Sequence, residues 1–236
     1  MTAEHVIPRA AGNDRRLWVH TLQSFAVGLP RGAQLQRGLT HSSLCGYCNN
    51  MAGTHYVPAF VRWTRQAVEY RSKLPAGSSV LLPFTLHALL VAKELAVMTL
   101  AMSEPLSIDL PHFLNLRRLV TQPRLNGRTP GFRFFVSFHC GPPVFEGVFG
   151  AIDTSGGPSP VVLCQVGLEP LGYVVTADDE RSIAWANRLG LCDISYFFEQ
   201  PYSVIRNDHL RLRFLHGEMP FRPMAQGSSE CRCAPG

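Results

Sequence analysis

The sequence lacks the segments that carry proteins into membranes or through the secretory pathway. Its N-terminus is polar, without the apolar core of a signal peptide, and its most apolar run, 81–102, is interrupted by His87, Lys93 and Glu94. The seven cysteines are odd in number and scattered, without the regular spacing of a disulfide framework. We therefore expect a protein of the reducing cytoplasm that does not span a membrane.

Internal repeats and low-complexity tracts are also missing, and only 17% of the residues are charged. A chain of 236 residues with 46% hydrophobic content can bury a core in one or two domains. The net charge of +5 is unevenly placed: residues 1–73 hold nine Lys/Arg against three Asp/Glu, and residues 74–236 hold thirteen against fourteen. A polyanion such as nucleic acid would be drawn to the first segment, although a solvated basic face explains the excess equally well.

The first third of the chain predicts two strands followed by a helix. Residues 4–8 read as a strand that Pro8 ends, and residues 40–44 read as a second strand after a long excursion. From Asn49 onward, apolar residues recur at spacings of three and four, which predicts a helix with Pro58 in its first turn. We therefore expect a ββα domain at residues 1–73.

The remainder predicts an α+β domain at residues 84–224. Residues 73–83 are rich in Pro, Gly and Ser and read as a linker, and helices are expected over 84–102 and 111–120. A Gly-Pro-Pro turn at 141–143 is expected to join two strands as a hairpin. The expected strands are 132–138, 144–152, 161–166, 172–176 and 210–214. This pattern favours two helices and a mostly antiparallel sheet.

The chemistry-bearing residues lie in two short pieces of the first third. Cys45 and Cys48 form the only Cys-x-x-Cys, and this spacing lets both sulfurs reach one tetrahedral Zn²⁺. Upstream, Glu4 and His5 set a carboxylate beside an imidazole. Each piece also has a plainer explanation. His5 can be a surface histidine, and Asn49 can be a helix cap. Cys45 and Cys48 can be a thiol pair without metal or a redox site, although the βαβ pattern of a thioredoxin is missing around them.

Taken together, the two pieces resemble the ββα-metal core of HNH endonucleases. The likeness is closest to the group in which E-H-x-x-P precedes C-x-x-C-N-N-x-x-G, and it covers roughly a quarter of the chain. Residues 86–102 and 168–174 resemble later segments of that group more weakly. The core likeness is carried by Glu4-His5-Val6-Ile7-Pro8-Arg9, by Leu44-Cys45-Gly46-Tyr47-Cys48-Asn49-Asn50 and by Gly53.

The resemblance implies a metal-dependent nuclease that acts on nucleic acid, with DNA as the expected substrate. His5 would be the general base that activates water, and its ordinary pKa of about 6.5 suits this role near neutral pH. Glu4 and Asn49 would bind a catalytic divalent cation, Mg²⁺ or a similar ion, while Cys45 and Cys48 would hold a structural Zn²⁺. Cleavage would leave a 5′-phosphate and a 3′-hydroxyl. The middle residue of the motif has three candidates: His41, Ser43 and Asn13.

The chain departs from that group in one respect. Members carry a first Cys-x-x-Cys shortly before the E-H segment, which completes the zinc site, whereas Met1 stands three residues before Glu4 here. Three explanations are open: a truncated chain, which we favour; a degenerate, inactive domain; or Cys231 and Cys233 as replacement ligands. The alternative function is therefore a catalytically inactive nucleic-acid-binding or interaction module on the same fold.

Overall fold

The computed structural model describes ten stretches of the chain. They are residues 2–5, 7–11, 17–19, 33–35, 40–74, 79–102, 111–140, 144–146, 149–150 and 161–216. Side chains are described for residues 7–11, 45–74, 79–102, 111–140 and 162–214.

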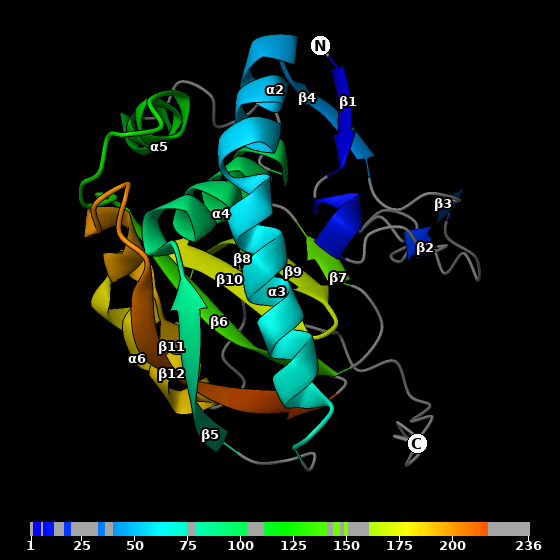
Figure 1. The fold of residues 1–236 in the computed structure, drawn as a ribbon, viewed down its shortest axis with the longest axis vertical. Helices are drawn as coiled ribbons and strands as arrows, with labels where there is room; N and C mark the ends of the chain where they lie inside the picture. Colours follow the sequence, from blue (N-terminus) through cyan, green and yellow to red (C-terminus); the bar gives the residue numbers. More distant parts are fainter. Residues whose placement is uncertain are drawn as a thin grey trace.

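The described elements combine five α-helices with a mostly antiparallel mixed sheet, which confirms the α+β class (Figure 1). Three of the helices, α4 to α6, follow residue 84, where two were expected. In chain order the elements are β1 (Thr2–His5), η1 (Arg9–Ala11), β2 (Leu17–Val19), β3 (Ala33–Leu35), β4 (Thr40–Leu44), α2 (Gly46–His55), α3 (Val57–Arg71), β5 (Ser79–Leu86), α4 (Ala88–Met102), α5 (Pro111–Thr121), β6 (Phe132–Cys140), β7 (Val144–Glu146), β8 (Phe149–Gly150), β9 (Val161–Leu168), β10 (Leu171–Ala177), α6 (Glu180–Leu189), β11 (Cys192–Asp193), η3 (Ser195–Glu199) and β12 (Arg206–His216).

The large sheet has the strand order β5-β12-β6-β10-β9-β7, with β11 paired to β6 and β8 paired to β9. Its neighbouring strands are antiparallel except where the end of β12 runs parallel to β6. Residues 206–213 of β12 pair with β5, and residues 214–216 pair with β6. The long strand β12 therefore joins the edge strand β5 to the centre of the sheet.

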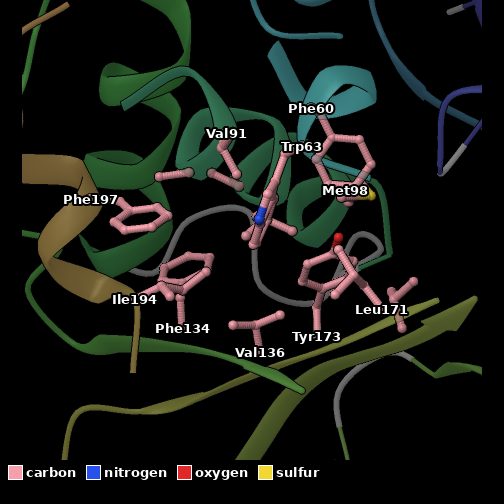
Figure 2. Packing of buried hydrophobic residues seen from close by; sticks show 14 of the residues in the cluster. Phe60, Trp63, Val91, Met98, Phe134, Val136, Leu171, Tyr173, Ile194 and Phe197 are labelled. Atoms are coloured by element: carbon pink, nitrogen blue, oxygen red, sulfur yellow. The ribbon is translucent and has the colours of Figure 1, made fainter. Parts of the chain in front are cut away.

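The central strand β6 packs on both of its faces, and successive strand residues point to opposite sides. Phe134 of β6 belongs to the main hydrophobic cluster with α3, α4 and α5, whereas the next residue, Phe135, packs with Trp185 of α6. At the centre of the main cluster, Trp63 is fully buried (Figure 2). Its ring lies 5.7–6.3 Å, centroid to centroid, from the rings of Phe60, Phe84, Tyr173 and Phe197.

The main cluster extends across the expected domain boundary. It includes Ile7 and Met51 from the first third of the chain as well as Phe214 at the far end. Apart from Lys93, Glu94 and Thr99, helix α4 is apolar on all sides, and it is buried between α3, α5 and the sheet, as expected for a helix without a solvent-facing stripe. The division into domains at 1–73 and 84–224 stays a prediction about folding units.

The segment expected to be a linker and the start of a helix is instead the strand β5. Leu82, Phe84 and Leu86 point into the core at every second position, which is the period of a strand. The prediction was wrong because the apolar residues continue from the strand into the helix. The change from the two-residue period of a strand to the 3.6-residue period of a helix, at His87, is therefore not recognisable in the sequence. Pro83 is compatible with this edge strand, because it needs no backbone N–H partner and its carbonyl accepts a hydrogen bond from the Tyr70 hydroxyl.

Two further predictions about the second part require correction. Strands β6 and β7 do not form a hairpin, because β10 and β9 lie between them in the sheet, and residues 141–143 lie outside the described part. Helix α6 was not expected, although its ends carry recognisable signals. Asp179 caps its first turn, with the backbone N–H of Ser182 donating to Oδ1 at 2.9 Å, and Gly190 ends it in the left-handed conformation (φ +71°).

Candidate functional site

The two pieces that carry the Glu-His and Cys-x-x-Cys motifs are neighbours in the fold. Strand β1 pairs with β4 in a separate two-stranded antiparallel sheet, with Glu4 opposite His41 and His5 opposite Thr40. Strand β4 has the predicted bounds, while β1 ends at His5, three residues before Pro8. Of Glu4, His5, His41 and Ser43 the structure describes the backbone, and Asn13 lies outside the described residues.

Helix α2 begins immediately after β4 and lies against β1. It starts at Gly46, three residues before the predicted Asn49, and it contacts β1 as well as α3 (Figure 1). Cys45 is its N-cap residue, and the Asn49 N–H donates to the Cys45 carbonyl at 3.0 Å. Asn49 is therefore fixed in the first turn of α2. Tyr56 separates α2 from α3, which has Pro58 in its first turn, as predicted.

The two thiols differ in exposure and in electrostatic environment. Cys45 is exposed and Cys48 is half-buried, and they are not joined by a disulfide. The backbone N–H of Cys48 donates to the Cys45 sulfur at 3.4 Å, and this hydrogen bond lowers the pKa of Cys45. A thiolate is the form that binds a metal or attacks an electrophile, so the lowered pKa favours this form of Cys45.

The described side chains do not complete a zinc site around these thiols. A structural zinc takes four ligands, and among the described residues no group of three or more His, Cys, Asp or Glu side chains could hold a metal. Cys231 and Cys233 lie outside the described part. Within that part, Cys45 and Cys48 are only two potential ligands where a structural zinc needs four, and we derive no role for zinc from them alone.

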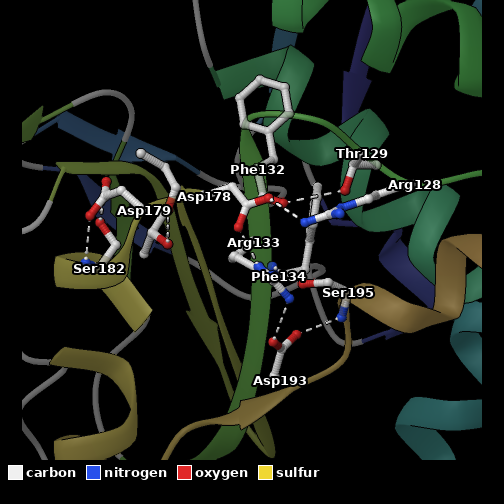
Figure 3. A network of polar contacts seen from close by, with 12 residues as sticks. Arg128, Thr129, Phe132, Arg133, Phe134, Asp178, Asp179, Ser182, Asp193 and Ser195 are labelled. Carbon is white, nitrogen blue, oxygen red and sulfur yellow. Dashed lines mark hydrogen bonds and ion pairs between the residues drawn. The ribbon is translucent and has the colours of Figure 1, made fainter. Parts of the chain in front are cut away.

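A second polar cluster, not expected from the sequence, lies at the start of β6. Arg133 donates from Nε to Asp178 Oδ1 at 2.6 Å and from Nη1 to Asp193 Oδ2 at 3.2 Å (Figure 3). Asp193 Oδ1 in turn accepts the backbone N–H of Ser195 at 2.8 Å, and the Ser195 hydroxyl accepts the N–H of Phe134. The hydrogen bond and charge of Asp178 are the main reasons that the pKa of Arg133 is raised.

These contacts make the cluster a clamp between elements that are distant in sequence. It joins the start of β6 to the end of β10 and to the β11–η3 turn, so its charges are paired inside the protein. The cleft beside it, about 80 Å³, is also lined by Arg128, Tyr196 and Glu199. We see here a structural role, because each charged group of the clamp already has a partner of opposite charge.

A lysine and a glutamate are buried in the middle of α4, where a core helix normally has apolar residues. Lys93 is fully buried, and Nζ donates to the carbonyls of Gln122 and Pro123 at 2.6 and 2.9 Å. These carbonyls follow the last turn of α5, where a cation is favoured by the helix dipole. Desolvation lowers the pKa of Lys93 to about 8. Lys93 therefore ties α5 to α4.

No described helix is long and apolar enough to cross a membrane. Comparison of the chain with protein-family models, with curated proteins and with solved structures finds no match. We therefore infer function from the residues themselves and from how the backbone places them.

Proposed function

We propose that the chain is a metal-dependent endonuclease of the HNH type, built on β1, β4 and α2. One observation carries the proposal. The strand with Glu4 and His5 is paired with the strand that leads directly into the Cys-x-x-Cys-Asn start of α2, and α2 lies back against β1. A strand pair followed by a helix is the arrangement that the resemblance requires, and the pairing joins residues about 35 positions apart, which helical or hairpin propensity alone does not bring together.

In this proposal the reaction is the hydrolysis of a phosphodiester bond. His5 accepts the proton of the attacking water, and Glu4 and Asn49 are the oxygen ligands for a divalent cation. When bound, Mg²⁺ would stabilise negative charge on the phosphate and on the leaving oxygen. Asn49 is suited to its part because the first turn of α2 holds its backbone in place.

The charge distribution supports a polyanionic substrate. The segment that carries the proposed centre, residues 1–73, has six more Lys/Arg than Asp/Glu. On α3, directly after α2, Arg62 and Arg65 are exposed. Excess positive charge around a site raises the local concentration of nucleic acid and speeds its association. DNA is the proposed substrate, and the cytoplasm is the proposed location.

The proposal is tested by cleavage of supercoiled plasmid and of single-stranded DNA with Mg²⁺ or Mn²⁺. Two neighbouring asparagines give a matched pair of variants. Asn49→Ala removes the proposed ligand, whereas Asn50→Ala changes an exposed residue one position later in α2. We expect the first to lose cleavage and the second to retain it. Equal rates for both variants, with both folded, would contradict the assignment of Asn49.

A binding module without catalysis is the alternative, and the same preparation distinguishes it. Salt-dependent binding of DNA without metal-dependent cleavage, in wild type and variants alike, would favour the binding module. Metal analysis of the purified protein, repeated with Cys45→Ser, reports separately on zinc. About one zinc per chain, lost in the Cys45→Ser variant, is expected if the thiol pair takes part in a complete site.

A further inference from the structure

The outer face of the β5–β12 strand pair carries a row of basic side chains that the charge count of the sequence conceals. His209, Arg211 and Arg213 of β12 are exposed, and they alternate with Leu210 and Leu212, which point into the core. We call these three residues the β12 strip. Residues 74–236 carry a net charge of −1. The local excess of positive charge arises because alternate side chains of β12 point to opposite faces, which places its basic residues together on one face.

The neighbouring strand does not neutralise this row. Opposite His209, Arg211 and Arg213, the register places Pro83, Leu81 and Ser79 of β5, none of which is charged. Among the described residues, neither arginine of the strip forms an ion pair. The carboxylate within the same strand, Asp208, points to the other face and is paired with Arg206 at 3.5 Å. The strip therefore presents uncompensated positive charge to solvent.

The end of the strip is held in position by α6. Arg213 donates from Nη1 to the carbonyl of Leu189 at 3.2 Å, at the negative end of the helix dipole. The Arg213 side chain passes so close to Gly190 that a Cβ there would lie 2.9 Å from Arg213 Cδ. Glycine at this position thus permits both the helix end and the path of the arginine. A fixed side chain loses less conformational entropy when it binds a ligand.

We propose that the β12 strip binds the backbone of single-stranded nucleic acid. Residues two apart in a strand are about 6.8 Å apart, so Arg211 and Arg213 are two cations at a regular spacing, with the polar His209 ring next in line, which suits an extended chain of phosphates. Arginine is favoured for phosphate because its planar guanidinium donates two parallel hydrogen bonds. The exposed Leu81 beside Arg211 offers apolar surface to a base.

An anionic membrane surface is a poorer fit. Binding to a lipid surface normally combines basic residues with aromatic or large apolar side chains that enter the interface. Within β5 and β12, the described large apolar side chain that is exposed is Leu81. Single-stranded nucleic acid belongs to the same class as the substrate of the proposed nuclease. The strip is nevertheless separate in sequence from His5 and Asn49, and binding of nucleic acid to the strip does not require cleavage.

The test is binding of a fluorescein-labelled 20-mer single-stranded DNA to the full chain, by anisotropy in EDTA so that cleavage does not interfere. Arg211→Gln removes one cation of the strip, and Arg181→Gln removes an exposed cation of α6 as the matched control. A single phosphate contact contributes about 0.7 to the slope of log affinity against log salt for single strands. The affinity ratio of wild type to Arg211→Gln should therefore fall about 2.6-fold between 50 and 200 mM salt.

The control defines the outcomes that would overturn the proposal. Arg181→Gln should keep the wild-type affinity and salt slope, and circular dichroism should show both variants folded. Equal losses in the two variants, or tighter binding of a 20-bp duplex than of the single strand, would refute the strip as a single-strand site. Capture by phosphatidylserine vesicles without binding of the oligonucleotide would do so as well. If Arg211→Gln weakens binding while no variant or wild type cleaves DNA, the strip stands and the nuclease proposal fails.

Discussion

Replacing Lys93 by methionine should change how the stability of the protein depends on pH. The pKa of Lys93 is 10.5 in an unfolded chain and about 8 in the folded protein, because burial disfavours the charged form. Between these two values the unfolded chain binds more protons, so the free energy of unfolding rises with pH. The two carbonyls that accept hydrogen bonds from Nζ hold the charged form in place below pH 8.

The size of the effect follows from the two pKa values. Relative to neutral pH, the Lys93 contribution to the free energy of unfolding should rise by about 1.4 kcal/mol at pH 9 and about 2 kcal/mol at pH 9.5. Lys93→Met has no titrating group at this position, so its curve should lack this rise. Other groups titrate in the same range, including Cys45 with its lowered pKa and Cys192 with its raised pKa, but they are common to both proteins.

The assay is urea unfolding of wild type and Lys93→Met at intervals from pH 7 to pH 9.5, and the quantity of interest is the difference between the two curves. Taking the difference cancels the thiol and tyrosine contributions, and it makes the absolute cost of the substitution irrelevant. Parallel curves across the whole range would show that Lys93 titrates normally, and would refute the account of a desolvated lysine capping α5.

Two further predictions concern polar contacts of the fold. Gln66→Ala should lower the free energy of unfolding, measured by urea titration, by about 1 kcal/mol. The reason is that the Gln66 amide donates to the Thr85 carbonyl and accepts from the Thr85 N–H in β5. Replacing the neighbouring exposed residue, Arg65→Ala, should leave the free energy of unfolding unchanged. Asp178→Asn should cost about 2 kcal/mol, because it leaves Arg133 without its shortest charged hydrogen bond, and a loss below about 0.5 kcal/mol would contradict the clamp.

Much of the fold could be predicted where a segment has a clear period or a clear end. The strand Thr40–Leu44 and the helix that begins at Pro111 have the predicted starts, because turn residues or proline mark them. β5 could not be separated from α4 in the sequence, because both belong to one continuous apolar run. Such a run is compatible with a buried helix and with a strand alike. The order of β6, β10, β9 and β7 depends on contacts between distant residues, and no local signal encodes it.

The site could be predicted in part for the same reasons. The second strand is a local feature and has the predicted bounds, whereas the Cys-x-x-Cys, expected on a turn before the helix, lies at the start of α2 with Cys45 as its N-cap. The pairing of β1 with β4 joins residues on either side of the long segment between His5 and Thr40, so only the fold could test it. Lys93 is visible in the sequence as a charge within an apolar run, but its acceptors at 122 and 123 follow a different helix and could not be predicted.

The proposed role of His5 in β1, activating water for phosphodiester hydrolysis, is measured by the rate of DNA cleavage by wild type and His5→Ala with saturating Mg²⁺ or Mn²⁺. Loss of a general base typically slows a reaction by about 10²–10⁴-fold. We expect a metal-dependent rate in wild type and a decrease of that order in a folded His5→Ala variant. Equal rates in the two proteins, or no metal-dependent cleavage by folded wild type, would contradict it.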